Sequence, residues 1–155
     1  MRDSSDWHPT AFRTHTIGQV VSNGADMIGE QVSVAGYAET VRGRGAIAFL
    51  MLRDGTGYIQ AFLKKDNMDE NTFTAVQSAS RESTVQVTGT VAQKRPPKVP
   101  EGEPTPPPEY EINVTEANIL SSAETPLPVG ITDDVNVGLD IRLDNRHLDL
   151  SLIHI

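Results

Sequence analysis

The chain has 155 residues, no cysteine and a formal net charge of −8 at pH 7. The length fits one domain with some tail to spare, and the absence of cysteine excludes disulfides, thiolate metal sites and cysteine nucleophiles. The acidic balance argues against non-specific nucleic-acid binding, which needs a broad basic surface, but it does not exclude a local basic patch. No segment reaches the ~18 apolar residues of a membrane span, and the start of the chain lacks the apolar core of a signal peptide, so we expect a soluble, cytoplasmic protein.

The first predicted strand lies near residue 30, after a lead-in (1–12) that we expect to be flexible. Val32, Val34 and Gly36 alternate with polar neighbours, which is the period of a half-buried strand. Gly36 predicts a bulge or a sharp bend, because a residue without Cβ tolerates either. The sequence RGRG at 42–45 predicts the turn that ends this strand.

Two apolar segments, AIAFLML (46–52) and GYIQAFL (57–63), flank the sequence RDGTG and predict a β-hairpin. Alternation gives the first segment two faces, one with Ile47, Phe49 and Met51, and the other with Ala48, Leu50 and Leu52. Both faces are apolar, so one of them is core and the other is either core or a platform for a ligand. Judged from the residues alone, Phe49 belongs to the core.

The next segment, MDENTFTAVQSASRES (68–83), predicts a helix. Asp66 or Asn67 suits the N-cap, acidic residues fill the first turn, and Phe73 and Val76 fall on one face.

Two further strands are predicted at 83–93 and 109–120. Between them, seven of the ten prolines of the chain lie from Pro96 to Pro108. Proline fixes φ and donates no backbone hydrogen bond, so this segment predicts a stiff, exposed loop. Residues 123–150 predict a linker or hinge that ends in a charged segment, either irregular or a short helix.

The order of three strands, a helix and two strands contains no strand–helix–strand repeat that would support a parallel sheet. It favours an all-β fold with one helix, namely a five-stranded Greek-key barrel of the oligonucleotide-binding (OB) kind over residues 13–122. Another small barrel or a sandwich is the alternative.

The hairpin carries residue types that suit a single-stranded nucleic acid. OB barrels bind single strands across their second and third strands. An unpaired base stacks on an aromatic ring for ~1–3 kcal/mol, and its edge needs a polar partner. Phe49 could supply the ring and Gln60 the polar group, because an amide side chain is both donor and acceptor.

Residues 32–63 resemble the anticodon-binding domain of the aspartyl- and asparaginyl-tRNA synthetases, the aspartate-type class II group. The family's Gly-Trp-Val strand is matched by Gly36-Tyr37-Ala38, and its Phe-x-x-x-Arg-Asp hairpin by Phe49 with Arg53-Asp54. The predicted fourth and fifth strands and the hinge follow in the same order, so the resemblance runs from about residue 13 to residue 150.

The resemblance implies roles for four residues in binding the anticodon loop of a tRNA, and the grouping of basic residues adds a fifth. In the family, the strand-2 Phe stacks on the middle anticodon base, a uracil, the strand-3 Gln bonds to that base, and a strand-5 Glu recognises the first base. These roles fall on Phe49, Gln60 and Glu111, which makes Phe49 a platform instead of core. Arg42 matches an Arg near the anticodon-loop phosphates, and Arg44 joins it in one basic group.

Other matched residues are expected to act on the barrel itself. Arg53 and Asp54 are expected to hold the hairpin turn together. The basic groups at 64–65 and 94–98 are either a solvated rim or part of the RNA-binding surface.

The amino acid served by the enzyme stays open at this stage. The segments RTH, AETPLP and DIRLDNR favour an aspartyl enzyme of the archaeal type, whereas LRDGTGYIQ and DVNV are closer to the asparaginyl branch. A generic single-strand-binding barrel, and a structural or partner-binding barrel with Phe49 in its core, are the further alternatives.

Two segments of the family's catalytic domain are missing from the sequence. Neither the Phe-Arg-x-Glu segment nor the late Gly-rich segment of the catalytic domain is present, so we expect the fragment to be inactive alone and assign no catalytic or metal-binding residue. ATP, magnesium and a homodimer are implied for the full-length enzyme. The final residues, 151–155, resemble the translation of a sequencing-library transposon end, and we expect them not to be native.

Overall fold

The computed structural model describes residues 12–95, 107–125, 127 and 138–146. The chain forms two compact units, Met1–Ala123 and Glu124–Ile155, and each is described by itself. Most of the predicted lead-in and of the proline-rich loop, much of the predicted linker, and the tail 151–155 lie outside the described residues.

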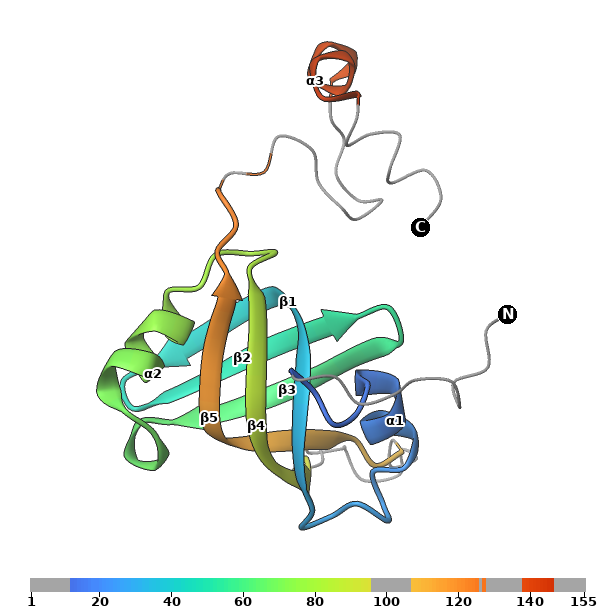
Figure 1. The fold of residues 1–155 in the computed structure, drawn as a ribbon, viewed down its shortest axis with the longest axis vertical. Coiled ribbons are helices and arrows are strands. Elements are labelled where there is room, and N and C mark those ends of the chain that lie inside the picture. The colour runs from blue at the N-terminus through green and yellow to red at the C-terminus, as the bar shows by residue number, and fades with distance from the viewer. Residues whose placement is uncertain (1–11, 96–106, 126, 128–137, 147–155) are drawn as a thin grey trace, which may run out of the picture. The chain divides into compact units, whose positions relative to one another are not determined.

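Five strands close into a barrel in the order β1-β2-β3-β5-β4 (Figure 1). The strands are β1 Gln31–Arg44, β2 Ile47–Asp54, β3 Gly57–Lys64, β4 Thr84–Gln93 and β5 Tyr110–Ser121. β3 pairs with β5 in parallel, and every other neighbouring pair is antiparallel. The predicted OB fold, with a helix between the third and fourth strands, is confirmed.

The helix between β3 and β4 is α2, Glu70–Gln77, which follows a short 3-10 turn, η2, at Lys65–Asn67. Its N-cap is Asp69, whose carboxylate accepts hydrogen bonds from the backbone N–H groups of Asn71 and Thr72. The predicted caps, Asp66 and Asn67, are wrong because both lie in η2. Phe73 and Val76 are buried, as the helical spacing predicts.

A second helix of the barrel unit, α1 at Ile17–Ser22, precedes β1 and was not predicted. α1 and α2 lie at opposite sides of the barrel (Figure 1). The other unit contains α3, Leu139–Asp144, in the segment predicted to be irregular or a short helix.

The burial of the two faces of β2 shows which apolar set belongs to the core. Ala48, Leu50 and Leu52 are fully buried, whereas Phe49 is 39% exposed. The interpretation of Phe49 as core, made from the residues alone, is therefore wrong. Because both faces of this strand are apolar, its composition could not tell the two apart.

Two glycine positions differ from the sequence prediction. β1 continues through Arg44, and the turn consists of Gly45, at φ +65°, and Ala46. The bulge of β1 lies between Ala38 and Thr40 and not at Gly36. A Cβ at Gly36 would lie 2.5 Å from the carbonyl oxygen of Arg53, so this glycine serves the close approach of β1 and β2.

The β2–β3 turn fastens α1 to the barrel. The backbone N–H of Ile17 donates to Asp54 Oδ2 at 3.0 Å, and that of Gly18 donates to Thr56 Oγ1 at 2.7 Å. Asp54 Oδ1 accepts from the backbone N–H of Thr56 at 2.7 Å and of Gly57 at 3.1 Å. The expectation that Asp54 holds the turn together is confirmed, and its carboxylate also holds the start of α1.

Arg53 joins β2 to two other segments. Its guanidinium forms salt bridges to Glu39 at 3.2 Å and to Glu82 at 2.6 Å. Burial opposes the charge of Arg53, but hydrogen bonds and Coulombic attraction from Glu82 and then Glu39 outweigh burial and raise the pKa of Arg53. Arg53 therefore joins β2 to β1 and to the segment before β4, and the prediction that it holds the hairpin turn is wrong for this residue.

Candidate nucleic-acid interface

The outer face of β1, β2, β3 and β5 carries side chains in rows that cross the strands. The register pairs Arg42 with Phe49, Phe49 with Phe62, and Phe62 with Asn113. The neighbouring row consists of Thr40, Met51, Gln60 and Glu111. Residues paired across adjacent strands point to the same face, so these two rows form one continuous surface.

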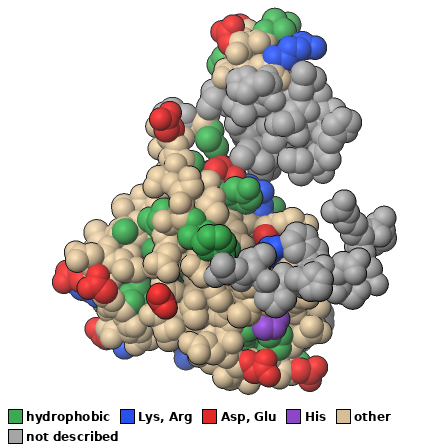
Figure 2. Space-filling model, viewed as in Figure 1, with side chains coloured by type: hydrophobic (Ala, Val, Ile, Leu, Met, Phe, Trp, Pro, Cys, Tyr) green, Lys and Arg blue, Asp and Glu red, His purple; other side chains and the backbone are tan. Residues whose placement is uncertain are grey.

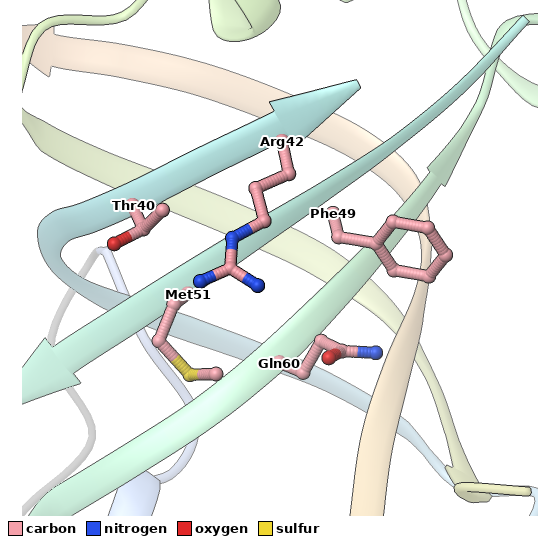
Figure 3. A pocket seen from close by; sticks show the side chains of 5 residues that line it. All are labelled: Thr40, Arg42, Phe49, Met51 and Gln60. Atoms are coloured by element: carbon pink, nitrogen blue, oxygen red, sulfur yellow. The ribbon is translucent and has the colours of Figure 1, made fainter. Parts of the chain in front are cut away.

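A shallow hollow of about 120 Å³ lies on this surface, lined by Thr40, Arg42, Phe49, Met51 and Gln60. Figure 3 shows the guanidinium of Arg42 extending from β1 across β2, above Met51 and toward Gln60. The hollow therefore combines an aromatic ring, an amide and a cation within one small area.

The ring of Phe49 packs against a second aromatic ring. Its centroid lies 5.3 Å from that of Phe62, with the two ring planes tilted by 44°. Phe49 is 39% exposed, so part of the ring remains open to a stacking partner. Rings in this arrangement stabilise each other by ~0.5–1.5 kcal/mol beyond their burial, which fixes the platform without covering it.

The amide of Gln60 is oriented by Glu111. Gln60 Nε2 donates to Glu111 Oε2 at 2.8 Å, through the parallel pairing of β3 with β5. A carboxylate only accepts hydrogen bonds, so this contact fixes which end of the amide is the nitrogen. Oε1 of Gln60 and its second N–H are left to serve as acceptor and donor for a ligand.

Basic side chains near the hollow differ in their ion pairing. Among the described residues, Arg42 and Arg44 make no salt bridge. Lys64 pairs with Asp66 at 3.0 Å, and Lys65 pairs with Glu70 at 2.6 Å. The two arginines are therefore the cations on this side that can pair with a phosphate at no cost to a salt bridge.

The structure brings four of the five predicted site residues together, Phe49, Gln60, Glu111 and Arg42. Arg44 lies one row farther along, opposite Ile47. Met51, which alternation places on the face of Phe49, also lines the hollow. Thr40 lines it as well and was not predicted, because the bulge in β1 hides the register of Thr40 with Met51 from a reading of alternation alone.

The charged side chains outside this hollow bear on the pattern of surface charge and on metal binding. In Figure 2, acidic side chains are scattered over the face shown and basic ones are few. In the described part of the chain, no group of three or more His, Asp or Glu side chains could hold a metal ion, so nothing there fits the magnesium implied for a catalytic domain. No helix within the described ranges is both long and apolar enough to cross a membrane.

Comparison with known proteins places the barrel in a sequence family. Residues 32–120 match the family model described as OB-fold nucleic acid binding domain, tRNA_anti-codon. The chain is 43% identical over 122 residues to the aspartate–tRNA(Asp/Asn) ligase of Natronomonas pharaonis, a match covering 79% of this chain and 26% of the relative.

Solved structures of aspartyl- and asparaginyl-tRNA synthetases are also similar to this chain. An asparaginyl-tRNA synthetase from Pyrococcus horikoshii superposes with a TM-score of 0.66 at 27% identity, covering 88% of this chain and 29% of that one. An aspartyl-tRNA synthetase from Entamoeba histolytica superposes with a TM-score of 0.67 at 27% identity, covering 96% and 34%. The chain therefore spans between about a quarter and a third of the length of these relatives.

Proposed function

The chain belongs to the family of OB-fold nucleic-acid-binding domains that its residues 32–120 match, and we propose that it binds the anticodon loop of a tRNA as the anticodon-binding domain of an aspartate–tRNA ligase. One observation carries this proposal: a partly exposed ring, Phe49, stands on the outer face of β2 beside an oriented amide, Gln60, on β3. This is the face on which OB folds bind single strands.

The chemistry of Gln60 suits a uracil. The edge of uracil presents one N–H donor between two carbonyl acceptors. Gln60 Oε1 accepts from that N–H, while the N–H of Gln60 not bound to Glu111 donates to a carbonyl. A cytosine presents an acceptor where uracil has its donor, so it would leave Gln60 Oε1 facing a lone pair.

Phe49 supplies a stacking contact that adds to the hydrogen bonds between Gln60 and the edge of the base. An unpaired base that stacks on the exposed part of the ring gains ~1–3 kcal/mol. Arg42 extends over the same hollow, and Arg44 lies at the end of β1. In this proposal both arginines contact phosphates of the loop, which position the RNA without reading its sequence.

Glu111 has two roles in this proposal. Its Oε2 orients Gln60 for the middle base. Its other oxygen accepts from a donor on the first anticodon base, the role that the resemblance implies. The two bases would then be read by one connected pair of side chains.

We also propose the activity of the longer enzyme to which this domain would belong. Relatives named aspartate–tRNA(Asp/Asn) ligase support a ligase that charges tRNA with aspartate, including tRNA-Asn. The family resemblance seen in the sequence adds ATP and magnesium, a homodimer and a cytoplasmic location to this proposal. An asparaginyl enzyme is the second candidate, because the segments LRDGTGYIQ and DVNV are closer to that branch and the Pyrococcus horikoshii protein superposes nearly as well as the aspartyl enzyme of Entamoeba histolytica. We propose that the 155 residues alone bind RNA and form no aminoacyl-tRNA.

The test is a titration of the 155-residue chain with two anticodon stem-loops that differ only in the central base, uracil or cytosine. We expect tighter binding of the uracil loop, and a loss of roughly 5- to 150-fold in affinity for it on Phe49→Ala. Leu120→Ala is the matched control, because Leu120 on β5 has nearly the same exposure, 40%, and lines no part of the hollow.

Each rival function predicts a different result. Equal affinity for both loops and for an unrelated loop favours a generic single-strand-binding barrel. An affinity unchanged by Phe49→Ala rejects the stacking role and, with it, the anticodon-binding proposal.

A further inference from the structure

A second hollow adjoins the one at Phe49. Its volume is about 360 Å³, against about 120 Å³ for the first, and the two share Met51 and Gln60 as lining residues. Pockets that bind small ligands have volumes of roughly 300–1,000 Å³. The second hollow is therefore large enough for a planar base together with part of its sugar, and it lies on the same outer face.

Tyr58 presents an aromatic ring at this hollow. It precedes Gln60 by two residues on β3, so the two side chains point to the same face, about 6.6 Å apart along the strand. Tyr58 is 57% exposed. Within the part of the chain that the structure describes, its hydroxyl has no hydrogen-bond partner and its ring packs against no other ring.

The walls of the hollow are held by the barrel. On one side, Tyr110 packs so closely on Gly24 that a Cβ there would lie 2.2 Å from the ring. On another side, Val21 comes from α1, which Asp54 and Thr56 fasten to the β2–β3 turn. These apolar walls are therefore in place before any ligand binds, which lowers the entropic cost of binding.

A polar pair stands at the edge of the hollow. Lys94 Nζ contacts Glu109 Oε2 at 2.6 Å, and the backbone N–H of Lys94 donates to the carbonyl of Glu109 at 2.8 Å. Both residues line the hollow. Lys94 Nζ has three N–H donors and Glu109 has two carboxylate oxygens, so the pair can stay intact while Lys94 contacts a phosphate and Glu109 accepts from the N–H group of a base.

We propose that Tyr58 is a second stacking platform, which holds the nucleotide next to the one on Phe49, with Lys94 and Glu109 at the edge of its base and phosphate. Gln60 and Met51 separate the two bases. The proposal rests on the proposed anticodon-loop function and adds a second binding position to it. Nucleotides on both sides of Gln60 would be splayed apart, which is how proteins expose single-stranded bases to side chains.

The experiment uses the uracil-centred stem-loop with 2-aminopurine placed directly before or directly after the central uracil. The fluorescence of this base is quenched when it stacks on a ring. We expect one of the two probes to be quenched on binding of the parent chain. Tyr58→Ala should abolish that quenching and weaken binding roughly 5- to 150-fold, whereas Tyr58→Phe should preserve both, because the ring remains.

Two controls keep the result interpretable. Leu120→Ala removes an exposed apolar side chain outside both hollows, and it should change neither signal nor affinity. Denaturant unfolding of Tyr58→Ala should match the parent, because the side chain is mostly exposed.

The outcomes separate this inference from the proposed function. If Phe49→Ala weakens binding while Tyr58→Ala leaves affinity and both probes unchanged, the second platform is overturned and the anticodon-loop function stands. If Phe49→Ala also has no effect, both proposals fall together. Quenching of one probe that depends on the Tyr58 ring supports the second platform.

Discussion

The two ends of β2 differ in how their side chains are used. At one end, Arg53 and Asp54 have their charges paired with Glu39 and Glu82 or hydrogen-bonded to backbone N–H groups. At the other end, Phe49 is partly exposed, and in the described residues Arg42 beside it forms no salt bridge.

The comparison separates residues that build the barrel from residues available to a ligand. Polar groups that are satisfied within the protein gain little from a partner, because binding would have to break existing contacts. An exposed ring and cations without a salt bridge can bind a ligand without breaking an existing contact. The Arg53–Asp54 end should therefore control stability, and the Phe49 end should control affinity.

Among the polar side chains of β2, the largest expected effect on stability comes from Asp54→Ala. This change removes the acceptor of the N–H groups of Ile17, Thr56 and Gly57, and hydrogen bonds to a charged group contribute ~1.5–3 kcal/mol each without adding fully. We expect the free energy of unfolding, measured in urea, to fall by about 3 kcal/mol. Asp54→Asn, which keeps one oxygen acceptor, should cost less, and equal unfolding of Asp54→Ala and the parent would contradict this role.

Arg53→Met comes next, because it leaves Glu82 without its cation. Glu82 has φ +68°, and among the described residues its Oε1 is buried without a hydrogen-bond partner. Removing one member of a buried pair costs ~3–5 kcal/mol, and because this site is partly exposed to solvent we expect about 2 kcal/mol. Lys65→Met, which breaks an exposed pair with Glu70, should cost less than about 1 kcal/mol.

The Arg53 contribution also has a defined pH dependence. A raised pKa means that the folded state favours the charged guanidinium, so the stabilisation is present below the ordinary pKa and is lost only as the pH rises through the folded value. Both pKa values lie far above pH 9. The difference in unfolding free energy between Arg53→Met and the parent, as far as it comes from this group, should therefore be equal at pH 7 and pH 9.

Glu111→Gln is a nearly isosteric change that tests whether Glu111 orients Gln60 for binding. A glutamine at 111 can still accept from Gln60, but it can also donate, so the Gln60 amide is no longer held in one orientation. We expect affinity for the uracil loop to fall by roughly 3- to 10-fold, with a smaller preference over the cytosine loop. Retention of the full preference would mean that Glu111 does not orient Gln60.

Arg42→Ala and Arg44→Ala should give the smallest change, seen best in the dependence of affinity on salt. For single strands the slope of log K against log salt is about −0.7 per phosphate contact. The contacts of these two arginines contribute about −1.4 to a shallow slope, and each substitution should reduce its magnitude by about 0.7. A steep slope in the parent chain would contradict a binding surface with so few cations.

The sequence predicted those parts of the molecule that rest on local periodicity. Alternation located the strands, and the face with Phe73 and Val76 located α2. α1 was missed because six residues, IGQVVS, are too short for a periodic signal. Its capping box, Thr16 with Gln19, was the available signal.

The site needed information that no local pattern contains. The composition of β2 could not decide between Phe49 and Leu50 as core, because the closure of the barrel decides it. The contact of Gln60 with Glu111 joins residues 51 positions apart through a parallel pairing. The family resemblance supplied both residues, but not the contact between them.

The most direct test compares Phe49→Ala with Leu50→Ala, two adjacent residues on opposite faces of β2. Leu50 is fully buried, so its loss should cost ~2–5 kcal/mol of unfolding free energy. Phe49→Ala should cost about 1 kcal/mol, chiefly its contact with Phe62, while affinity for the uracil-centred stem-loop falls roughly 5- to 150-fold. A Phe49→Ala chain that unfolds as easily as Leu50→Ala but binds the loop as the parent does would contradict the account.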